Sequence, residues 1–443
     1  MRTLKRIPRS LLFAGTILIA GAAMAALLRG GDPAAPGIET QTDARPVPAE
    51  SIPPPEVGAE PVSAAAPAPA EVPSGPLDLD RIRSLVNLPT AAVENGKLVQ
   101  HLSDGSVLEY SIDIEAQTAV QQVFDRYDVP VGAAVAIEVK TGRVVVFASR
   151  SRGPVERDPC LDATPPAASL FKIVTSAALI EDAGVSPDER VCYRGVNGVK
   201  RFNLSDLDLV PDESDPSIAC ATLAEGVARS LNPVLGRLAD QKLSPRVLLR
   251  RAERFVFGRA IPFELPVDVS PVEIPQDRLE FARTAAGFWH VGLSPLHAAA
   301  LTQAVANGGS MLQPRLVDRI VAPDGTERWA SESRLLRTVV RPETAETLTR
   351  MMLGTVDSGT ARKEFYDEQN NAHLGIAVAG KTGSLVNPSP YLSYSWFVGF
   401  APAPAGDDPA WAVAVLIVNE ERWRIKAAFA AREVLKSLLA AES

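Results

Sequence analysis

The chain has 443 residues, of which 46% are hydrophobic, enough for one large domain or for two or three smaller ones with a substantial core. Its net charge of −8 argues against nucleic acid as the main partner, because a phosphate backbone requires a basic face. The four histidines (His101, His290, His297 and His373) lack the short spacing of metal ligands, so the sequence predicts no metal and no cofactor.

The first 29 residues combine a basic tip with an apolar run. Four basic residues lie within the first nine positions, and the 18 residues 11–28 carry no charge. This run is at the short end of what crosses a bilayer, and we expect a retained single-pass anchor at 1–29. The small residues 22–26 leave a cleaved signal peptide as the alternative. In both cases the positive-inside rule places the tip in the cytoplasm and the rest of the chain outside it.

Residues 30–76 form a second region of distinct composition. They hold 12 of the chain's 37 prolines and show no apolar periodicity. Such a segment cannot bury a core, and we expect a disordered tether that holds the globular part away from a membrane. Globular patterning begins at residue 77, and we expect a short lead-in segment at 77–125 followed by the main domain at 126–443.

Hydrophobic periodicity from residue 77 onward predicts strands toward both ends and helices between them. The predicted strands are 97–102, 106–110, 131–139, 143–148, 376–379, 395–400 and 411–418. The predicted helices are 116–127, 165–180, 223–229, 233–241, 293–307, 345–356 and 425–439. This order predicts an α+β domain whose sheet combines early and late segments.

The first candidate for catalysis is Ser169, three residues before Lys172 in the predicted helix 165–180. Residues three apart share a helix face, so the hydroxyl and the amine can meet. Burial among the apolar neighbours would lower the pKa of the lysine from about 10.4, and a neutral lysine can take the proton of a serine nucleophile. In isolation, however, a Ser-x-x-Lys pair is more often a surface or capping serine with an exposed lysine.

A second candidate motif is Ser230-Leu231-Asn232, just before a predicted helix start. The hydroxyl of Ser230 can relay a proton to a leaving amine. The amide of Asn232 can orient a substrate carbonyl and form a hydrogen bond with Lys172. A simple helix cap is the alternative interpretation.

The third motif, Lys381-Thr382-Gly383-Ser384, follows the predicted strand 376–379. A lysine and a hydroxyl that face a cleft can hold a substrate carboxylate, and Gly383 permits close approach of the backbone. The N–H of Ser384 can form an oxyanion hole with the N–H of Ser169. A second Lys-Thr-Gly, at 140–142, lies between two predicted strands and is interpreted as a hairpin turn.

Three cysteines fit an exported chain with one disulfide and one free thiol. We favour the pair Cys192–Cys220, because both residues lie between the first and second motifs, and this leaves Cys160 over. Three buried free thiols are the alternative.

With the three motifs in this order, the chain resembles the penicillin-binding protein transpeptidase family. Ser230 follows Ser169 by 61 residues and Lys381 follows Ser230 by 151, and the long second gap is more similar to high-molecular-weight transpeptidases than to class A or D β-lactamases. The resemblance covers roughly 77–440. Further segments are similar to the family, namely 136–142, 292–299, 306–309, 356–361 and 395–402.

The resemblance implies a β-lactamase/transpeptidase-like fold: a five-stranded antiparallel sheet flanked by helices, plus an all-helical subdomain, with the site between them. It implies that Ser169 attacks a D-Ala-D-Ala stem peptide of peptidoglycan while Lys172 takes its proton. Ser230 would pass the proton to the departing D-Ala, and Asn232 would orient the substrate. Lys381 and Thr382 would hold the terminal carboxylate.

The implied outcome is a cross-link with the amine of a second stem peptide, at a bacterial cytoplasmic membrane with the catalytic domain in the periplasm. β-Lactams would acylate Ser169 as mimics of the substrate, and other cell-wall synthesis proteins are further expected partners. Two departures from the family are the short segment 77–125, which has no room for a pedestal or glycosyltransferase domain, and Ser384 in place of threonine. A D,D-carboxypeptidase, a β-lactamase and a non-catalytic penicillin-binding scaffold or sensor are the alternatives.

Overall fold

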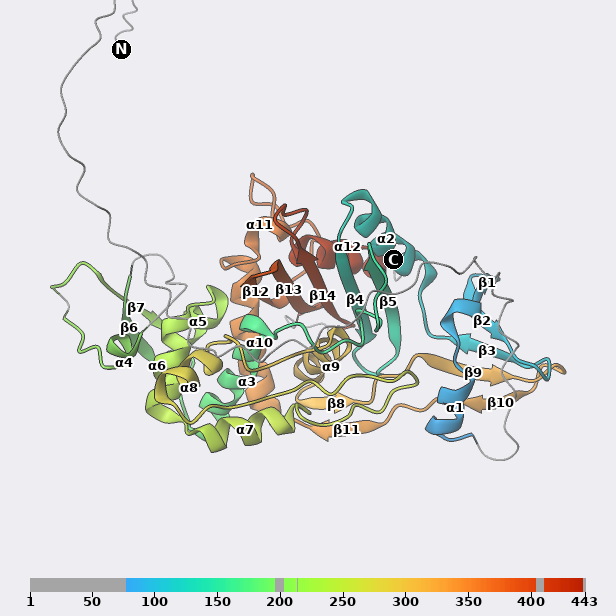
Figure 1. The fold of residues 1–443 in the computed structure, drawn as a ribbon, viewed down its shortest axis with the longest axis horizontal. Helices are drawn as coiled ribbons and strands as arrows, with labels where there is room; N and C mark the ends of the chain where they lie inside the picture. Colours follow the sequence, from blue (N-terminus) through green and yellow to red (C-terminus); the bar gives the residue numbers. More distant parts are fainter. Residues whose placement is uncertain (1–76, 196–202, 213, 404–409, 441–443) are drawn as a thin grey trace, which may run out of the picture. The chain divides into compact units, whose positions relative to one another are not determined.

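The computed structural model of the chain describes residues 77–195, 203–212, 214–403 and 410–440. A five-stranded sheet built from early and late segments forms its centre (Figure 1). The strands run antiparallel in the order β12-β13-β14-β4-β5. Their bounds are Val131–Glu138 for β4, Val144–Ser151 for β5, Ala379–Pro388 for β12, Tyr391–Ala401 for β13 and Trp411–Asn419 for β14. The predicted α+β class with a five-stranded antiparallel sheet is confirmed.

Three further sheets, one of five strands and two of two strands, complete the strands of the described residues. They have the orders β1-β2-β3-β9-β10, β11-β8 and β6-β7. The bounds are Ala92–Glu94 (β1), Lys97–His101 (β2), Val107–Tyr110 (β3), Arg190–Arg194 (β6), Ile218–Thr222 (β7), Ser310–Leu312 (β8), Val317–Val321 (β9), Glu327–Ala330 (β10) and Leu335–Thr338 (β11).

Twelve α-helices surround these sheets in the described residues, and nine of them, α3 to α11, lie between β5 and β12 in the sequence. Their bounds are Leu79–Leu85 (α1), Ile114–Arg126 (α2), Lys172–Ala177 (α3), Leu204–Leu207 (α4), Leu223–Ala228 (α5), Asn232–Lys242 (α6), Pro245–Arg254 (α7), Arg278–Ala285 (α8), Pro295–Ala306 (α9), Pro342–Asp357 (α10), Arg362–Phe365 (α11) and Ala427–Ala440 (α12).

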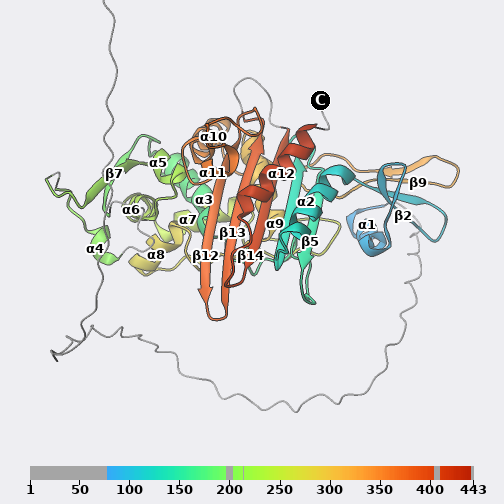
Figure 2. The ribbon, with the colours of Figure 1, turned by 90° about the horizontal axis from the view of Figure 1, so that it is seen from above.

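The central sheet is covered on both faces, as the alternation along β14 shows. Val413 and Val415 belong to one buried cluster, and Ala412 and Ala414 to the other. Helices α2 and α12 cover the first face and lie across the strands in Figure 2. Helix α9, which is buried along its whole length, covers the second face. The sheet is therefore the middle layer of a three-layer core.

The second five-stranded sheet joins the lead-in segment to the middle of the chain. Strand β3 pairs with β9, so that Leu108 lies opposite Ile320. Both side chains are fully buried, and together with Ile82 and Leu85 of α1 they belong to the same core cluster as one face of the central sheet. The sequence predicted the hairpin β2–β3 but not its distant partner β9.

The expected all-helical subdomain is wrong in one respect, because the hairpin β6–β7 stands within it. In β6, Val191 and Tyr193 are buried while Arg190 and Arg194 are exposed. This alternation has the period of a strand, and a helix would place the two buried side chains on different faces.

Two predicted element boundaries also differ from the structure. The predicted helix 165–180 consists of a 3-10 turn at Ala168–Phe171, the short helix α3 and a π turn at Ala178–Asp182. The predicted strand 376–379 begins only at Ala379 and continues through the third motif, because its ladder with β13 runs on to the pair Pro388 and Tyr391. The motif therefore lies within the strand.

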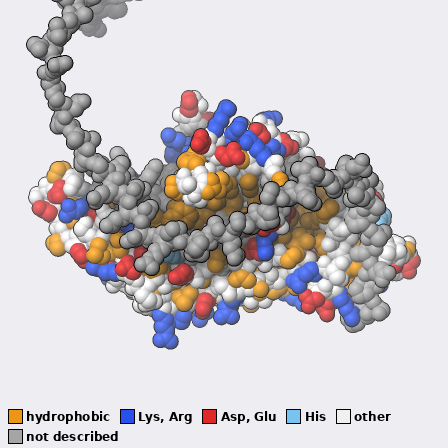
Figure 3. Space-filling view, viewed as in Figure 1, with side chains coloured by type: hydrophobic (Ala, Val, Ile, Leu, Met, Phe, Trp, Pro, Cys, Tyr) orange, Lys and Arg blue, Asp and Glu red, His pale blue; other side chains and the backbone are white. Residues whose placement is uncertain are grey.

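On the face drawn in Figure 3, acidic and basic side chains are interspersed rather than gathered by sign. Among the described residues, none of the helices has the length and apolar character that crossing a membrane requires. The predicted anchor at 1–29 and the predicted tether at 30–76 lie outside the described residues.

Candidate active site

A cavity of about 890 Å³ is lined by residues of β12, β13 and the helical region, and it contains members of all three motifs. The predicted site residues that line it are Ser169, Ser230, Asn232, Thr382 and Ser384. Lys172 and Lys381 have no exposed surface, and each donates a hydrogen bond to a serine that lines the cavity. The structure thus brings together residues that are far apart in the sequence.

Ser169 sits in the 3-10 turn at Ala168–Phe171, which is held in an unusual conformation. Ala168 has a φ of 48°, in the left-handed region that residues with a side chain rarely adopt. Gly287 lies directly against this turn, since a Cβ built on it would be 2.4 Å from the Ala168 carbonyl oxygen. The indole N–H of Trp396 donates to the Pro166 carbonyl at 2.9 Å. These contacts fix the turn that carries the Ser169 hydroxyl.

Lys172 connects its own motif to the second one through hydrogen bonds. Its Nζ donates to Ser169 Oγ and to Asn232 Oδ1, each at 2.8 Å, and to the carbonyl oxygen of Ala286. Burial, followed by the nearby charge of Lys381, holds the pKa of Lys172 well below its usual value. A neutral amine can keep the bonds to Asn232 and Ala286 and accept the proton of Ser169.

Lys381 lies behind Ser230 rather than at the cavity surface. Its Nζ donates to Ser230 Oγ at 3.0 Å and to the Thr382 carbonyl at 2.8 Å. Burial lowers the pKa of Lys381 to about 7. Lys381 can therefore act on a bound carboxylate in two ways: by orienting the Ser230 hydroxyl and by the attraction of its charge when it is protonated.

Strand β12 carries the third motif along the edge of the cavity. A Cβ built on Gly383 would lie 3.4 Å from the Cβ of Ala168, so the strand runs beside the turn that holds Ser169. The Thr382 hydroxyl lies 2.5 Å from the hydroxyl of Thr360, whose N–H donates to the Ala228 carbonyl. No motif in the sequence marks Thr360 for a role, although the segment 356–361 is similar to the family.

Two exposed tryptophans, Trp289 and Trp423, line the cavity with 44% and 43% of their surface accessible. Phe288, Leu385 and Val386 line it too, so an apolar wall stands beside the polar residues. Such a combination suits a ligand with an apolar part and a few polar groups. Sequence reasoning missed these residues, because no periodicity or motif marks an exposed aromatic residue in a loop.

Two carboxylates line the cavity, and both are in ion pairs. Glu280 Oε1 lies 2.7 Å from Arg283, and its Oε2 lies 3.5 Å from His290. Glu364 lies 3.3 Å from Lys426. Lys172, whose Nζ lies 2.8 Å from Ser169 Oγ, is better placed than either acid to act as the base for Ser169.

The second Lys-Thr-Gly forms the hairpin turn between β4 and β5, as predicted, and Gly142 has a φ of 78°. Cys192 and Cys220 form a disulfide across β6 and β7, and Cys160 is a buried free thiol. These features lie outside the set of residues that line the cavity.

Taken together, these contacts form two hydrogen-bonded groups beside one cavity, Ser169 and Asn232 around Lys172 and Ser230 around Lys381. This arrangement suits acyl transfer through a covalent serine ester. The described residues that line the cavity also supply the hydroxyls of Ser230 and Thr382, which can donate hydrogen bonds to a carboxylate.

Comparison with known proteins agrees with this chemistry. A family model described as the penicillin binding protein transpeptidase domain matches residues 132–440. Penicillin-binding protein PbpB of Mycolicibacterium smegmatis is 28% identical over 347 residues, which cover 72% of this chain and 51% of that protein. Peptidoglycan D,D-transpeptidase PbpA of Mycobacterium tuberculosis is 26% identical over 319 residues, which cover 65% of this chain and 62% of that protein. The chain thus spans between half and about three fifths of these relatives.

Solved structures show the same fold. The D,D-transpeptidase domain of a peptidoglycan glycosyltransferase from Eggerthella lenta matches with a TM-score of 0.62 and 26% identity, covering 75% of this chain and 83% of that chain. The imipenem acyl-enzyme complex of penicillin-binding protein A from M. tuberculosis matches with a TM-score of 0.63 and 25% identity, covering 76% of this chain and 80% of that chain.

Proposed function

This chain belongs to the penicillin-binding protein transpeptidase family, and from that premise we propose that it is a peptidoglycan D,D-transpeptidase. The observation that carries the proposal is the position of Lys172 Nζ, 2.8 Å from both Ser169 Oγ and Asn232 Oδ1. A buried amine with a lowered pKa, in contact with a serine that faces a cavity, is a base and nucleophile pair. The substrate is a stem peptide that ends in D-Ala-D-Ala.

Acylation begins when Ser169 Oγ attacks the carbonyl carbon of the penultimate D-Ala and its proton moves to Lys172 Nζ. The backbone N–H groups of Ser169 and Ser384 stabilise the negative oxygen of the tetrahedral intermediate. The bond to the nitrogen of the last D-Ala then breaks, and that nitrogen receives a proton through the Ser230 hydroxyl. The last D-Ala leaves, and an ester joins Ser169 to the shortened peptide.

Substrate orientation relies on the other motif residues. Asn232 orients the peptide while it holds Lys172. The terminal carboxylate binds at Thr382 with the positive charge of Lys381 behind it, and Gly383 allows the strand to approach the ligand closely. The amine of a second stem peptide then attacks the ester, forms the cross-link and releases Ser169.

Transfer to an amine is favoured over hydrolysis by the position of the two carboxylates in the cavity. A hydrolase requires a base positioned to activate water. Glu280 and Glu364, the acids that line the cavity within the described chain, are each in an ion pair. Neither acid is among the hydrogen-bond partners of Lys172 or Lys381 in the described chain, which supports a long-lived acyl-enzyme that awaits an amine.

A β-lactam that mimics D-Ala-D-Ala acylates Ser169 in the same way. The catalytic domain lies in the periplasm, and residues 1–29 anchor the chain in the cytoplasmic membrane, where other cell-wall synthesis proteins are its partners. Sequencing the N-terminus of the mature protein tests the anchor, since a start near residue 27 instead of Met1 would contradict it.

The decisive test of function is labelling of the full chain with a fluorescent penicillin, beside Ser169→Ala, followed by washout. We expect a label that requires Ser169 and persists for many minutes. Rapid decay of the label would instead indicate a β-lactamase or a D,D-carboxypeptidase. No label on a folded wild-type chain would indicate a non-catalytic scaffold.

A further inference from the structure

The turn Ser230-Leu231-Asn232 connects α5 to α6 in a conformation that needs support. Ser230 has a φ of 56°, which costs free energy for a residue with a side chain and persists only where surrounding contacts enforce it. The Leu231 N–H donates to the Gly226 carbonyl at 2.8 Å. A Cβ on Gly226 would lie 2.8 Å from a methyl group of Val234, so α5 and α6 pack closely. The positions of these two helices therefore set the geometry of the turn.

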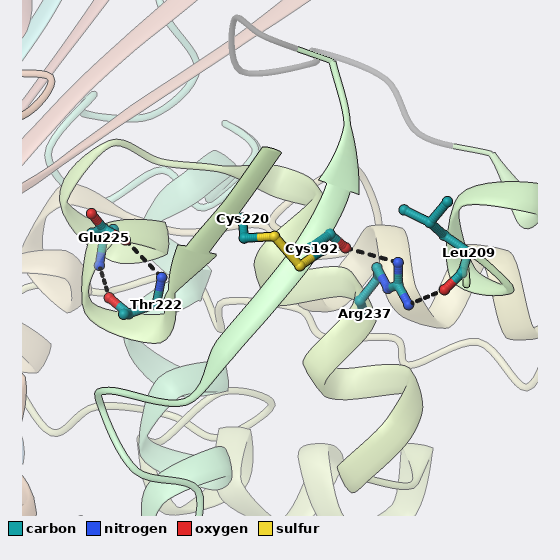
Figure 4. Close-up of a disulfide and its surroundings, with 6 residues drawn as sticks. All are labelled: Cys192, Leu209, Cys220, Thr222, Glu225 and Arg237. Carbon is teal, nitrogen blue, oxygen red and sulfur yellow. Dashed lines mark hydrogen bonds between the residues drawn. A yellow bond between two sulfur atoms is a disulfide. The ribbon is translucent and has the colours of Figure 1, made fainter. Parts of the chain in front are cut away.

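The start of α5 is tied to the disulfide hairpin. Strand β7 ends at Thr222, which caps the first turn of α5 together with Glu225 (Figure 4). The Thr222 hydroxyl accepts from the Glu225 N–H, and the Glu225 carboxylate accepts from the Thr222 N–H. Cys220 lies two residues before Thr222 and is bonded to Cys192 in β6. The disulfide thus holds the strand that leads directly into α5.

Helix α6 is tied to the same hairpin through Arg237. This side chain is buried, and its two terminal nitrogens donate to the carbonyl oxygens of Cys192 and Leu209, each at 2.8 Å (Figure 4). No carboxylate lies within ion-pair distance of it in the described chain, and its Nε has no hydrogen-bond partner there. The charges of Asp206, Asp208 and Asp240 offset only part of the cost of burial, since burial still lowers the pKa of Arg237, so its placement calls for an explanation.

We propose that Arg237 and the Cys192–Cys220 disulfide are positioning elements for acyl transfer, which hold the Ser230–Asn232 turn against Lys172 and Lys381. The hairpin closes a ring from Cys220 through α5, the turn and α6 back to Cys192. Two links can be opened: the Cys192–Cys220 disulfide and the hydrogen bond from Arg237 to the Cys192 carbonyl. Loss of either one lets α5 and α6 shift relative to each other. The inference rests on the proposed function and names residues that act on the site without touching the substrate.

The ring predicts that the enzyme responds to reduction. A dithiol transfers two hydrogens to the disulfide, leaving Cys192 and Cys220 as thiols while it becomes a disulfide itself. We expect the reduced enzyme to acylate more slowly, because Asn232 Oδ1 and Ser230 Oγ no longer sit at hydrogen-bond distance from Lys172 and Lys381. An exported protein meets an oxidising compartment in which the disulfide persists.

The test measures the second-order rate constant of acylation by a fluorescent penicillin, as a function of pH, on the full chain. The variants are Arg237→Met and the double change C192S/C220S. We expect a loss of about 10- to 100-fold, the scale of a displacement near 1 Å in a catalytic group. The acylation rate should rise with pH as Lys172 loses its proton, and we call this rise the acidic limb of the profile. We also expect the acidic limb to move to lower pH. Without the bond to Asn232 Oδ1, and with the charge of Lys381 still nearby, the protonated form of Lys172 is less stable and its pKa falls further.

Arg315→Met is the matched control. Arg315 is a partly buried arginine that also donates to two backbone carbonyls, those of Thr141 and Ser331. It lies against the β4–β5 turn and, unlike Arg237, is also 3.6 Å from a carboxylate, that of Asp318. We expect this variant to lower the unfolding temperature without moving the acidic limb. Arg237→Lys, which keeps the charge and can reach one of the two carbonyls, should recover part of the rate.

Each outcome decides a separate point. Unlabelled wild-type protein would overturn the proposed function itself. Labelled wild type with an unchanged rate and profile in Arg237→Met and C192S/C220S would overturn the inference and leave the function standing. If a variant fails to fold, the same rate is measured instead on folded wild-type protein after reduction of the disulfide. Mass spectrometry then verifies that Cys192 and Cys220 are free thiols. An unchanged acylation rate after complete reduction would then overturn the inference.

Discussion

At the scale of single residues, the two buried lysines decide the chemistry. Lys172 and Lys381 have no exposed surface, and neither forms an ion pair in the described chain. A buried ammonium without a carboxylate is unfavourable, so burial shifts both side chains toward the neutral amine. Spacing alone predicted that Lys172 reaches Ser169. The effect of Lys381 on Lys172 required the fold, because 209 residues separate them.

The pH dependence of acylation follows from the lowered pKa of Lys172. Only the neutral amine can accept the Ser169 proton, so the acylation rate rises as pH passes the pKa of Lys172 and then reaches a plateau. We expect that plateau well below the usual lysine pKa of about 10.4. Lys172→Arg should lose about 10²- to 10⁴-fold in rate, since a guanidinium stays protonated. A limb centred near pH 10 in stopped-flow acylation would contradict this role.

The pKa of Lys381 predicts how stability changes with pH. The folded value of about 7 lies below the unfolded value, so the unfolded chain binds more protons between these two pH values and stability rises with pH there. Lys381→Met removes this cost. Its stability advantage over wild type should be largest below pH 7 and shrink toward about pH 10, the region of the unfolded lysine pKa. Urea unfolding at several pH values measures it, and an advantage that grows with pH would refute the assignment.

At the scale of elements, the sequence predicted helices better than the turn that holds Ser169. Helix α9 begins with a Ser294 cap and a proline at its first position, signals that can be read locally. The 3-10 turn at Ala168–Phe171 has no such signal, because the positive φ of Ala168 is held by distant segments: Gly287 lies against the Ala168 carbonyl, and Trp396 bonds the Pro166 carbonyl just before the turn. The strand β9 was missed for the same reason: its partner β3 lies about 200 residues earlier in the chain.

The contact between Gly287 and the Ser169 turn gives a prediction at this scale. In Gly287→Ala, the new Cβ would lie 2.4 Å from the Ala168 oxygen, so the turn must shift and acylation should slow at least about tenfold. Gly258→Ala is the control, since Gly258 has a similar φ of 71° but its Cβ would meet nothing closer than 3.8 Å. That variant should cost only about 1–2 kcal/mol in the free energy of unfolding. Equal acylation rates in both variants would show that the turn tolerates displacement.

At the scale of the whole molecule, the site exists because the central sheet joins both ends of the described chain. Ser230 and Lys381 are 151 residues apart, yet their side chains form a hydrogen bond. Their order in the sequence, read with the family resemblance, predicted that they share a cleft. It did not predict that Lys381 would be buried behind Ser230 or that Trp289 and Trp423 would form part of the wall, since these depend on packing between segments that local patterns do not connect.

The same long-range assembly predicts that residues 77–111 are required for a stable domain. Leu108 and Tyr110 of β3 are buried, β3 pairs with β9, and both side chains belong to the core cluster that includes Ile82 and Leu85 of α1. Burial of each such side chain stabilises by about 1.5–3 kcal/mol. A chain that begins at residue 112 keeps α2 but leaves the edge of β9 unpaired. We expect a lower unfolding temperature and self-association through the exposed strand, relative to a chain that begins at residue 77.

Point substitutions grade this prediction without removing a segment. Leu108→Ala should cost about 2–5 kcal/mol in the free energy of unfolding, because it leaves a cavity in a packed core. Val93→Ala in strand β1, whose side chain is 56% exposed, should cost less than about 0.5 kcal/mol. Calorimetry and size-exclusion chromatography measure both effects. A monomeric chain from residue 112 with an unchanged unfolding temperature would mean that β9 is stable without β3, and that the central sheet and helical region fold independently of the segment before them.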